Sequence, residues 1–276
     1  MSIWWKSSLI SERIYRESMI RFCTLYSSSN GNCTFISDTK TNILIDAGVS
    51  ASKITASLQK IGVNPNDIDA ILITHEHSDH TCGLGVFTRK YSVPVYTNSA
   101  TADAISKGDC IDSKYINIFT TGESFVVGTA SVRPFKTPHD AAESVGYTVS
   151  FDERKFGFAT DTGCITKPML SALAGCEAVV IEANHNVDML MSGSYPYPLK
   201  KRILSDNGHL SNENCAWLAT QLAIWGTKYI TLGHLSTNNN TYEMAYESAV
   251  KLLRDNNLDT DVFLNVAQKS EITHII

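Results

Sequence analysis

A cluster of histidine and acidic residues directly follows a short apolar segment near residue 75. The stretch ILITHEHSDHTCGLG, residues 71–85, places three histidines, a glutamate and an aspartate within six positions. Imidazole and carboxylate are common ligands of divalent metals, whereas a solvated loop more often carries Lys, Glu or Ser. His75 and His77 alternate by two, so an extended strand end points both side chains the same way. The helical zinc-protease motif HExxH is absent, because Asp79 follows His75 by four residues.

The remaining sequence alternates short strands with helices. The apolar patterns predict helices over residues 50–62, 99–108, 167–175, 212–226 and 241–257. They predict strands over residues 20–26, 34–38, 41–48, 69–74, 91–98, 178–184, 228–236 and 260–268, and hairpin strands over 123–140 and 144–163 with a turn at 152–155. Because no repeat or linker divides these elements, residues 20–276 are predicted to form a single α/β domain with a layered sheet core flanked by helices.

Composition limits the possible functions. Apolar residues make up 43% of the 276 residues and charged residues 18%, as in ordinary globular proteins. The net charge of −5 excludes a polycation that coats nucleic acid, so any such contact needs a local basic patch. The seven cysteines form no CxxC pair, which argues against a zinc ribbon and favours the reducing cytoplasm. The apolar runs are too short to span a membrane.

Residues 1–19 are predicted to be an N-terminal extension, either helical or disordered. They contain neither a continuous apolar segment nor a small-residue cleavage site, so we expect no signal peptide. Residues 9–19 fit an amphipathic helix on the surface. An upstream start codon, with Met19 as the true start, is the alternative.

Histidine and aspartate recur where other predicted strands end, at Asp46, His139, Asp161 and His234. Side chains at strand ends converge on one rim of a layered sheet. Two metal sites about 3.5–4 Å apart need six or seven ligands around a shared water. The sequence offers one triad of His75, His77 and His139, a second triad of Asp79, His80 and His234, and Asp161 as the bridge.

These motifs carry a family resemblance. THEHSDH matches the HxHxDH signature, and LIDAG, KTPHDA, FATDTG and GHLS follow in the expected order. From about residue 20 onward the chain resembles the metallo-β-lactamase superfamily. It looks most like the WalJ/YycJ-type hydrolases of bacteria, a similarity that SSSNGNCT, EANH and YPYPLKKRILSDNGHLSN extend.

The resemblance implies an αββα four-layer sandwich with a dinuclear metal site at one rim of the sheets. It implies that the seven residues of the two triads and the bridge are metal ligands, and that Asp46 is a buried acid supporting them. It also implies 5′-to-3′ exonuclease action on DNA. The cofactors are predicted to be two divalent ions, Zn, Mn or Fe. A hydroxide shared by the metals would be the nucleophile, with Asp79 orienting the metal-bound water.

A local basic and aromatic stretch suggests where DNA binds. Residues 195–202 combine Tyr195 and Tyr197 with Lys200, Lys201 and Arg202, and single-stranded nucleic acid needs both stacking and charge. The alternative is a solvated helix face with packed tyrosines.

Two further segments are candidates for phosphate binding. His209 and Ser211 precede a predicted helix, where they either grip an anion or provide a plain cap. The SSSNGN segment is either a hairpin turn or a small-residue loop near the metals; its candidate contacts are Ser28, Ser29, Asn30 and Asn32.

The sequence therefore predicts a dinuclear metal-dependent phosphodiesterase, a 5′-to-3′ DNA exonuclease whose partner is DNA with a free 5′ end. One alternative is a hydrolase of a small lactone, thioester or cyclic phosphodiester. Another is a regulatory or scaffold protein whose metals are structural. No membrane contact is predicted, and the sequence does not indicate an oligomeric state.

Overall fold

The structure is a computed structural model that describes residues 20–107 and 111–276. The predicted extension over residues 1–19, with its helix over 9–19, lies outside the described residues.

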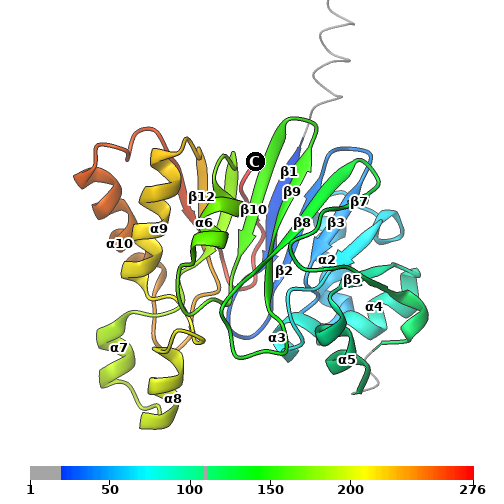
Figure 1. Ribbon diagram of the computed structural model, residues 1–276, viewed down its shortest axis with the longest axis horizontal. Helices are drawn as coiled ribbons and strands as arrows, with labels where there is room; N and C mark the ends of the chain where they lie inside the picture. Colours follow the sequence, from blue (N-terminus) through cyan, green and yellow to red (C-terminus); the bar gives the residue numbers. More distant parts are fainter. Residues whose placement is uncertain (1–19, 108–110) are drawn as a thin grey trace, which may run out of the picture.

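Two mixed sheets of seven strands each form the centre of the molecule (Figure 1). The first sheet has the order β14 (Thr273–His274), β1 (Arg21–Tyr26), β2 (Cys33–Ser37), β3 (Asn42–Ile45), β4 (Ala70–Leu72), β5 (Val95–Thr97) and β6 (Ile116–Ile118). The second has the order β13 (Phe263–Val266), β12 (Tyr229–Gly233), β11 (Ala178–Glu182), β10 (Arg154–Ala159), β9 (Val145–Phe151), β8 (Ala130–Lys136) and β7 (Phe125–Val127). In each sheet one part is antiparallel and the other parallel.

Most helices cover the outer faces of the two sheets (Figure 1). Their bounds are α2 (Ala51–Lys60), α3 (Ser78–Thr81), α4 (Leu84–Tyr91), α5 (Ser99–Lys107), α6 (Lys167–Leu173), α7 (Val187–Ser192), α8 (Tyr197–Ile203), α9 (Asn212–Ile224) and α10 (Tyr242–Asp255). One apolar cluster joins α2 and α4 to the first sheet, and another joins α6, α9 and α10 to the second. A third cluster, which includes Ile43, Tyr147, Phe156 and Val180, fills the space between the sheets. The predicted αββα four-layer sandwich is therefore confirmed.

The residues after β4 differ from the sequence prediction. We predicted no helix between residues 75 and 91 and a strand over residues 91–98, but residues 78–91 contain α3 and α4, and β5 has only three residues. Leu84, Phe87 and Thr88 are buried on one face of α4. The apolar pattern of α4 covers only eight residues and directly follows the histidine cluster, so it is hard to detect in the sequence.

Other elements were also missing from the prediction. Residues 187–203 form the short helices α7 and α8, and the edge strands β6 and β14 were not expected. Each has two to seven residues, too few to show a clear period in the sequence.

The strands end at a common rim. Asp46 follows β3 directly, Asp161 lies two residues after β10, and His234 follows β12. The short helix α3 lies at the lower edge of the sandwich in Figure 1. Within the described part of the chain, no helix combines the length and the hydropathy needed to cross a membrane.

Candidate metal centre

The first predicted triad is assembled at this rim. Ring nitrogens of His75, His77 and His139 all lie within 4.8 Å of one another. His75 is fully buried and His139 nearly so, whereas His77 is partly exposed. The three residues come from the end of β4 and the loop after β8, so the contact joins the two sheets.

The second triad lies beside the first. Ligand atoms of Asp79, His80 and His234 are also within 4.8 Å of one another. Asp79 Oδ2 is 3.4 Å from His80 Nε2 and 3.4 Å from His234 Nε2. Asp79 and His80 are carried by α3, and His234 by the end of β12.

Asp161 lies between the triads. Its Oδ2 is 3.2 Å from His80 Nε2, and its Oδ1 is 3.4 Å from His234 Nε2 and 3.7 Å from His139 Nε2. One carboxylate therefore reaches atoms of both triads, which is the position required of a bridging ligand.

Hydrogen bonds behind the site orient three imidazoles. His80 Nδ1 lies 2.7 Å from Asp46 Oδ2, and His234 Nδ1 lies 2.9 Å from Glu182 Oε1. His139 Nδ1 lies 3.0 Å from the Gly208 carbonyl oxygen. Because a carboxylate or carbonyl can only accept, each Nδ1–H donates and each Nε2 is turned into the site.

The residues fit divalent metal ions. The Nε2 atoms of His75 and His139 are buried and have no hydrogen-bond partner, a costly arrangement that a cation would relieve. Burial lowers the pKa of both imidazoles, so these rings are neutral as ligation requires. Burial alone would raise the pKa of Asp161, but His234 and His80 hold it well below its usual range. The side chains of the histidine and aspartate cluster could thus hold divalent metal ions.

The pKa of His234 is shifted in the opposite direction. Burial opposes the charge on His234, but Asp161, Asp79 and Glu182 raise its pKa to about 10. Ligation requires the neutral ring, so a metal would displace this proton.

The backbone turns sharply where three strands reach the site. Asp46, Asp161 and His234 have φ values of 63°, 55° and 55°, in the left-handed region. Aspartate and histidine adopt this region more readily than most residues other than glycine. Such conformations cluster at functional sites.

The segment between β1 and β2 packs against the metal centre. Asn32 Nδ2 is 3.2 Å from His80 Nε2 and 3.4 Å from Asp79 Oδ2. Ser28 Oγ accepts from the Asn30 amide, while Ser29 Oγ accepts from the Asn184 side chain. The SSSNGN segment is therefore both a turn between strands and a small-residue loop near the cluster.

The predicted DNA-binding cations are partly engaged within the protein. Lys200 Nζ donates to the carbonyl oxygens of Met191 and Gly193, at 2.7 Å each, and so ties α8 to the end of α7. Arg202 pairs with Asp140. Of the three cations, Lys201 alone has neither an ion pair nor a side-chain hydrogen bond with any residue in the described ranges. The adjacent tyrosines also differ, since Tyr197 is 71% exposed whereas Tyr195 Oη accepts from Asn238.

His209 and Ser211 lie close together but have different contacts. Ser211 is the N-cap of α9, where its hydroxyl accepts from the Asn214 amide at 3.3 Å. His209 is 18% exposed at the side chain, and its Nδ1 lies 2.8 Å from Glu182 Oε1 and 3.8 Å from Asp161 Oδ1.

Sequence reasoning missed Glu182. This fully buried carboxylate accepts from His209, His234 and the amides of Thr162 and Leu210. It is the last residue of β11, so the strand-end pattern that indicated Asp46 and Asp161 would have indicated it as well.

Comparison with known proteins identifies the class. A model of the Beta-lactamase superfamily domain matches residues 41–234. The chain therefore belongs to the metallo-β-lactamase superfamily.

It is 40% identical over 256 residues to the exodeoxyribonuclease WalJ of Streptococcus pneumoniae, a match covering 92% of this chain and 95% of that protein. It is 40% identical over 239 residues to the exodeoxyribonuclease YycJ of Bacillus anthracis, covering 86% and 90%. Within the superfamily, the chain belongs to the WalJ/YycJ family.

Solved structures agree on the fold. The metallo-β-lactamase fold protein YhfI of Bacillus subtilis superimposes with a TM-score of 0.69 at 14% identity, covering 92% of this chain and 99% of that one.

Proposed function

We propose that this protein is a metal-dependent exodeoxyribonuclease that removes nucleotides from the 5′ end of DNA. The observation that carries the proposal is the pair of triads joined by Asp161. Relatives that match over nearly their whole length are exodeoxyribonucleases. We propose two divalent ions, held by the seven predicted ligands; Zn, Mn and Fe all suit histidine with carboxylate.

When bound, such ions act as Lewis acids and lower the pKa of a bound water. Asp79, whose side chain is 23% exposed, would accept a hydrogen bond from the attacking water and so orient it. The buried carboxylates of Asp46 and Glu182 hold His80 and His234 in position. Residues 20–276 are proposed to act as one domain.

His209 is our candidate for the acid that protonates the leaving oxygen. Its Nδ1 lies 2.8 Å from Glu182 Oε1, which leaves Nε2 free to give a proton. Burial opposes the charge on the ring, but Glu182 and Asp161 raise the pKa of the imidazole. Its ring centroid is 4.9 Å from that of His139. A His209→Gln variant should lose about 10²–10⁴-fold in kcat while KM changes little.

We propose that the 5′-terminal phosphate occupies a hollow beside His234. This hollow of about 290 Å³ is lined by Ser28, Ser236, Thr237 and Lys269, among others. It adjoins the metal centre through Ser27, whose hydroxyl accepts from the His234 amide. Hydroxyl groups and an ammonium are suitable partners for a phosphate.

A nuclease assay tests the function. The substrates are single- and double-stranded DNA with a 5′ phosphate or a 5′ hydroxyl, with added Mn²⁺ or Zn²⁺. We expect metal-dependent shortening from the 5′ end, faster on phosphorylated DNA and lost in an Asp161→Asn variant. Protein that holds two ions and cuts no DNA, but turns over bis(p-nitrophenyl) phosphate or a thioester, would instead be a small-ester hydrolase.

An Asp161→Asn protein that retained its full cellular role would favour a scaffold with structural metals. The cytoplasmic location that the cysteines indicate stays a prediction.

A further inference from the structure

Two adjoining hollows begin at His139 and follow β8. The inner hollow, of about 420 Å³, is lined by residues at the end of β8 and in the loop after it, and also by Thr166, Pro168 and Asn207. The outer hollow, of about 330 Å³, lies between β8 and α6 and includes Arg133 and Ser171. Both are lined by Lys136 and Pro168, so together they form one groove, here called the β8 groove.

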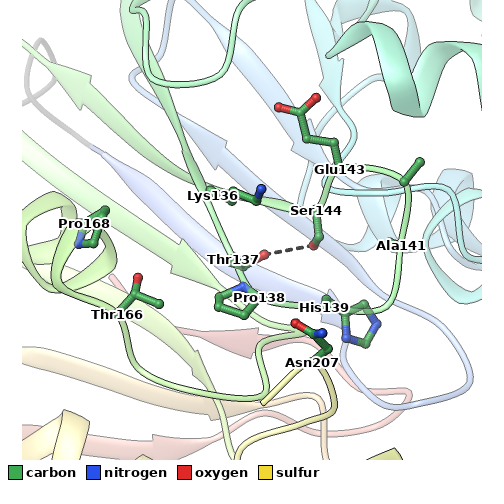
Figure 2. A pocket seen from close by; sticks show the side chains of 11 residues that line it. Lys136, Thr137, Pro138, His139, Ala141, Glu143, Ser144, Thr166, Pro168 and Asn207 are labelled. Atoms are coloured by element: carbon green, nitrogen blue, oxygen red, sulfur yellow. Dashed lines mark hydrogen bonds between the residues drawn. The ribbon is translucent and has the colours of Figure 1, made fainter. Parts of the chain in front are cut away.

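The inner hollow has the size and chemistry of a nucleoside site. Figure 2 shows Thr166 and Pro168 across from Lys136 and Pro138, with His139 and Asn207 at the lower rim. The two proline rings offer apolar surface to a flat base, while the hydroxyl of Thr166 and the amide of Asn207 offer polar contacts. The volume falls in the range of small-molecule sites, roughly 300–1,000 Å³.

The groove also carries positive charge that the protein itself does not use. Arg133 and Lys136 are exposed, and neither forms an ion pair with any residue of 20–107 or 111–276. They are three residues apart on β8, roughly 10 Å along the strand, so their side chains point to opposite faces of the second sheet. Both residues nevertheless line the outer hollow, whereas the inner hollow is lined by Lys136 together with the acidic residue Glu143. By contrast, Lys200 and Arg202 on α8 are already bound within the protein.

We propose that the β8 groove binds the body of the DNA strand beyond the scissile phosphate. A nucleoside lies between Pro138 and Pro168, and the following phosphates lie at Lys136 and Arg133. The groove starts at His139, one of the proposed metal ligands, so a strand leaving the reacting phosphate enters it directly. This inference rests on the proposed function and adds to it the path of the substrate.

Removing both charges tests the path. In the metal-loaded Arg133→Ala/Lys136→Ala protein, we expect KM for a 5′-phosphorylated single-stranded 20-mer to rise about tenfold with kcat little changed. The slope of log affinity against log salt should fall by about 1.4, for two lost phosphate contacts. Turnover of bis(p-nitrophenyl) phosphate, which has one phosphate and so has none to place at Lys136 or Arg133, should change much less. A matched control, Lys53→Ala/Lys60→Ala, removes two exposed charges from α2 and should leave all three values unchanged.

Filling the outer hollow gives a second test. Ser171 is exposed on α6, and a Ser171→Trp side chain would occupy the hollow. We expect a raised KM for the 20-mer and an unchanged KM for a dinucleotide. The Ser171→Ala variant leaves the hollow open and should behave as the wild type.

The outcomes separate the groove from the nuclease. A wild-type protein that shortens DNA, with KM and salt dependence unaltered in both variants, overturns the groove and leaves the function standing. A wild-type protein that cuts no DNA overturns both.

Discussion

Gly48 fixes how closely two backbone segments of the metal centre approach each other. A Cβ atom at this position would lie 1.6 Å from the carbonyl oxygen of Asp79 and 2.7 Å from the amide nitrogen of Asn32. Both neighbours are backbone atoms that no rotamer change can move. The glycine of LIDAG is therefore required by packing against α3, which carries two of the proposed ligands.

A Gly48→Ala variant should be destabilised by about 1–3 kcal/mol, because Asp79 must shift to admit the methyl group. The same shift should weaken metal binding. Denaturant unfolding and metal titration measure the two effects. The exposed Gly62→Ala, with open space around its Cβ position, serves as a control for backbone strain alone. An unchanged metal affinity in Gly48→Ala would show that Asp79 does not depend on this contact.

At the scale of single residues, the sequence predicted which side chains meet better than what holds them. His75, His139 and Asp161 were found because strand ends converge at one rim and because histidine and aspartate recur at these ends. The hydrogen bonds to Glu182 and the contact of His139 with the Gly208 carbonyl were not predicted, because they depend on how separate loops pack. Backbone carbonyls leave no signal in a sequence.

Among the elements, α9 begins at Ser211, whose hydroxyl satisfies the otherwise free Asn214 amide. This hydrogen bond accounts for a serine at position 211 without any contact to a substrate. A Ser211→Ala variant should lose about 1 kcal/mol of stability, as expected for an N-cap. KM for 5′-phosphorylated DNA should stay the same, and thermal unfolding together with steady-state kinetics measures both quantities. A raised KM with unchanged stability would indicate that Ser211 binds the substrate.

An ion pair links neighbouring strands at the opposite end of the second sheet. Arg154 at the start of β10 pairs with Glu177 just before β11, at 2.8 Å, and this contact lowers the pKa of the Glu177 carboxyl. The folded-state pKa of Glu177 is lower than its pKa in the unfolded chain, so the ionised carboxylate stabilises the folded protein at any pH above the unfolded-state pKa. This stabilisation is lost as the pH falls through the folded-state pKa.

The Glu177→Gln variant should therefore be less stable than the wild type at neutral pH, by about 0.5–1 kcal/mol. The difference should shrink as the pH falls below the usual glutamate value of 4.5. Urea unfolding at a series of pH values measures it. A difference that stays constant down to about pH 3 would contradict the lowered pKa.

The helices divide into those that sequence patterns reveal and those that they do not. In α2, Ile54 and Leu58 are buried four residues apart, and the helix was predicted almost to its ends. In α8, Ile203 is the one buried residue among seven, so there was no apolar period to detect. Its position depends instead on Lys200 and on the pairing of Arg202 with Asp140.

For the whole molecule, the metal centre lies where the two sheets come together. His75 and His80 follow a strand of the first sheet, whereas His139, Asp161 and His234 follow strands of the second. An ion held by both groups binds the folded protein and not the unfolded chain. Metal binding should therefore strengthen the association of the sheets.

Removal of metal should lower the melting temperature. At a free metal concentration about a thousandfold above Kd, one site adds about 4 kcal/mol to the stability. Calorimetry before and after chelation, with the metal content measured alongside, should show this loss and its recovery with Zn²⁺ or Mn²⁺. A loaded and a stripped protein that melt at the same temperature would mean that the ions do not couple to folding.

The left-handed turns at Asp161 and His234 have a practical consequence for redesign. The other five proposed ligands have backbones that nearly any amino acid can adopt, so replacing them causes no backbone strain. At Asp161 and His234 the realistic choices narrow to aspartate, asparagine, histidine or glycine. An attempt to adapt the site to a different ion therefore meets a backbone restriction on residue type at two of the seven proposed ligand positions and none at the other five.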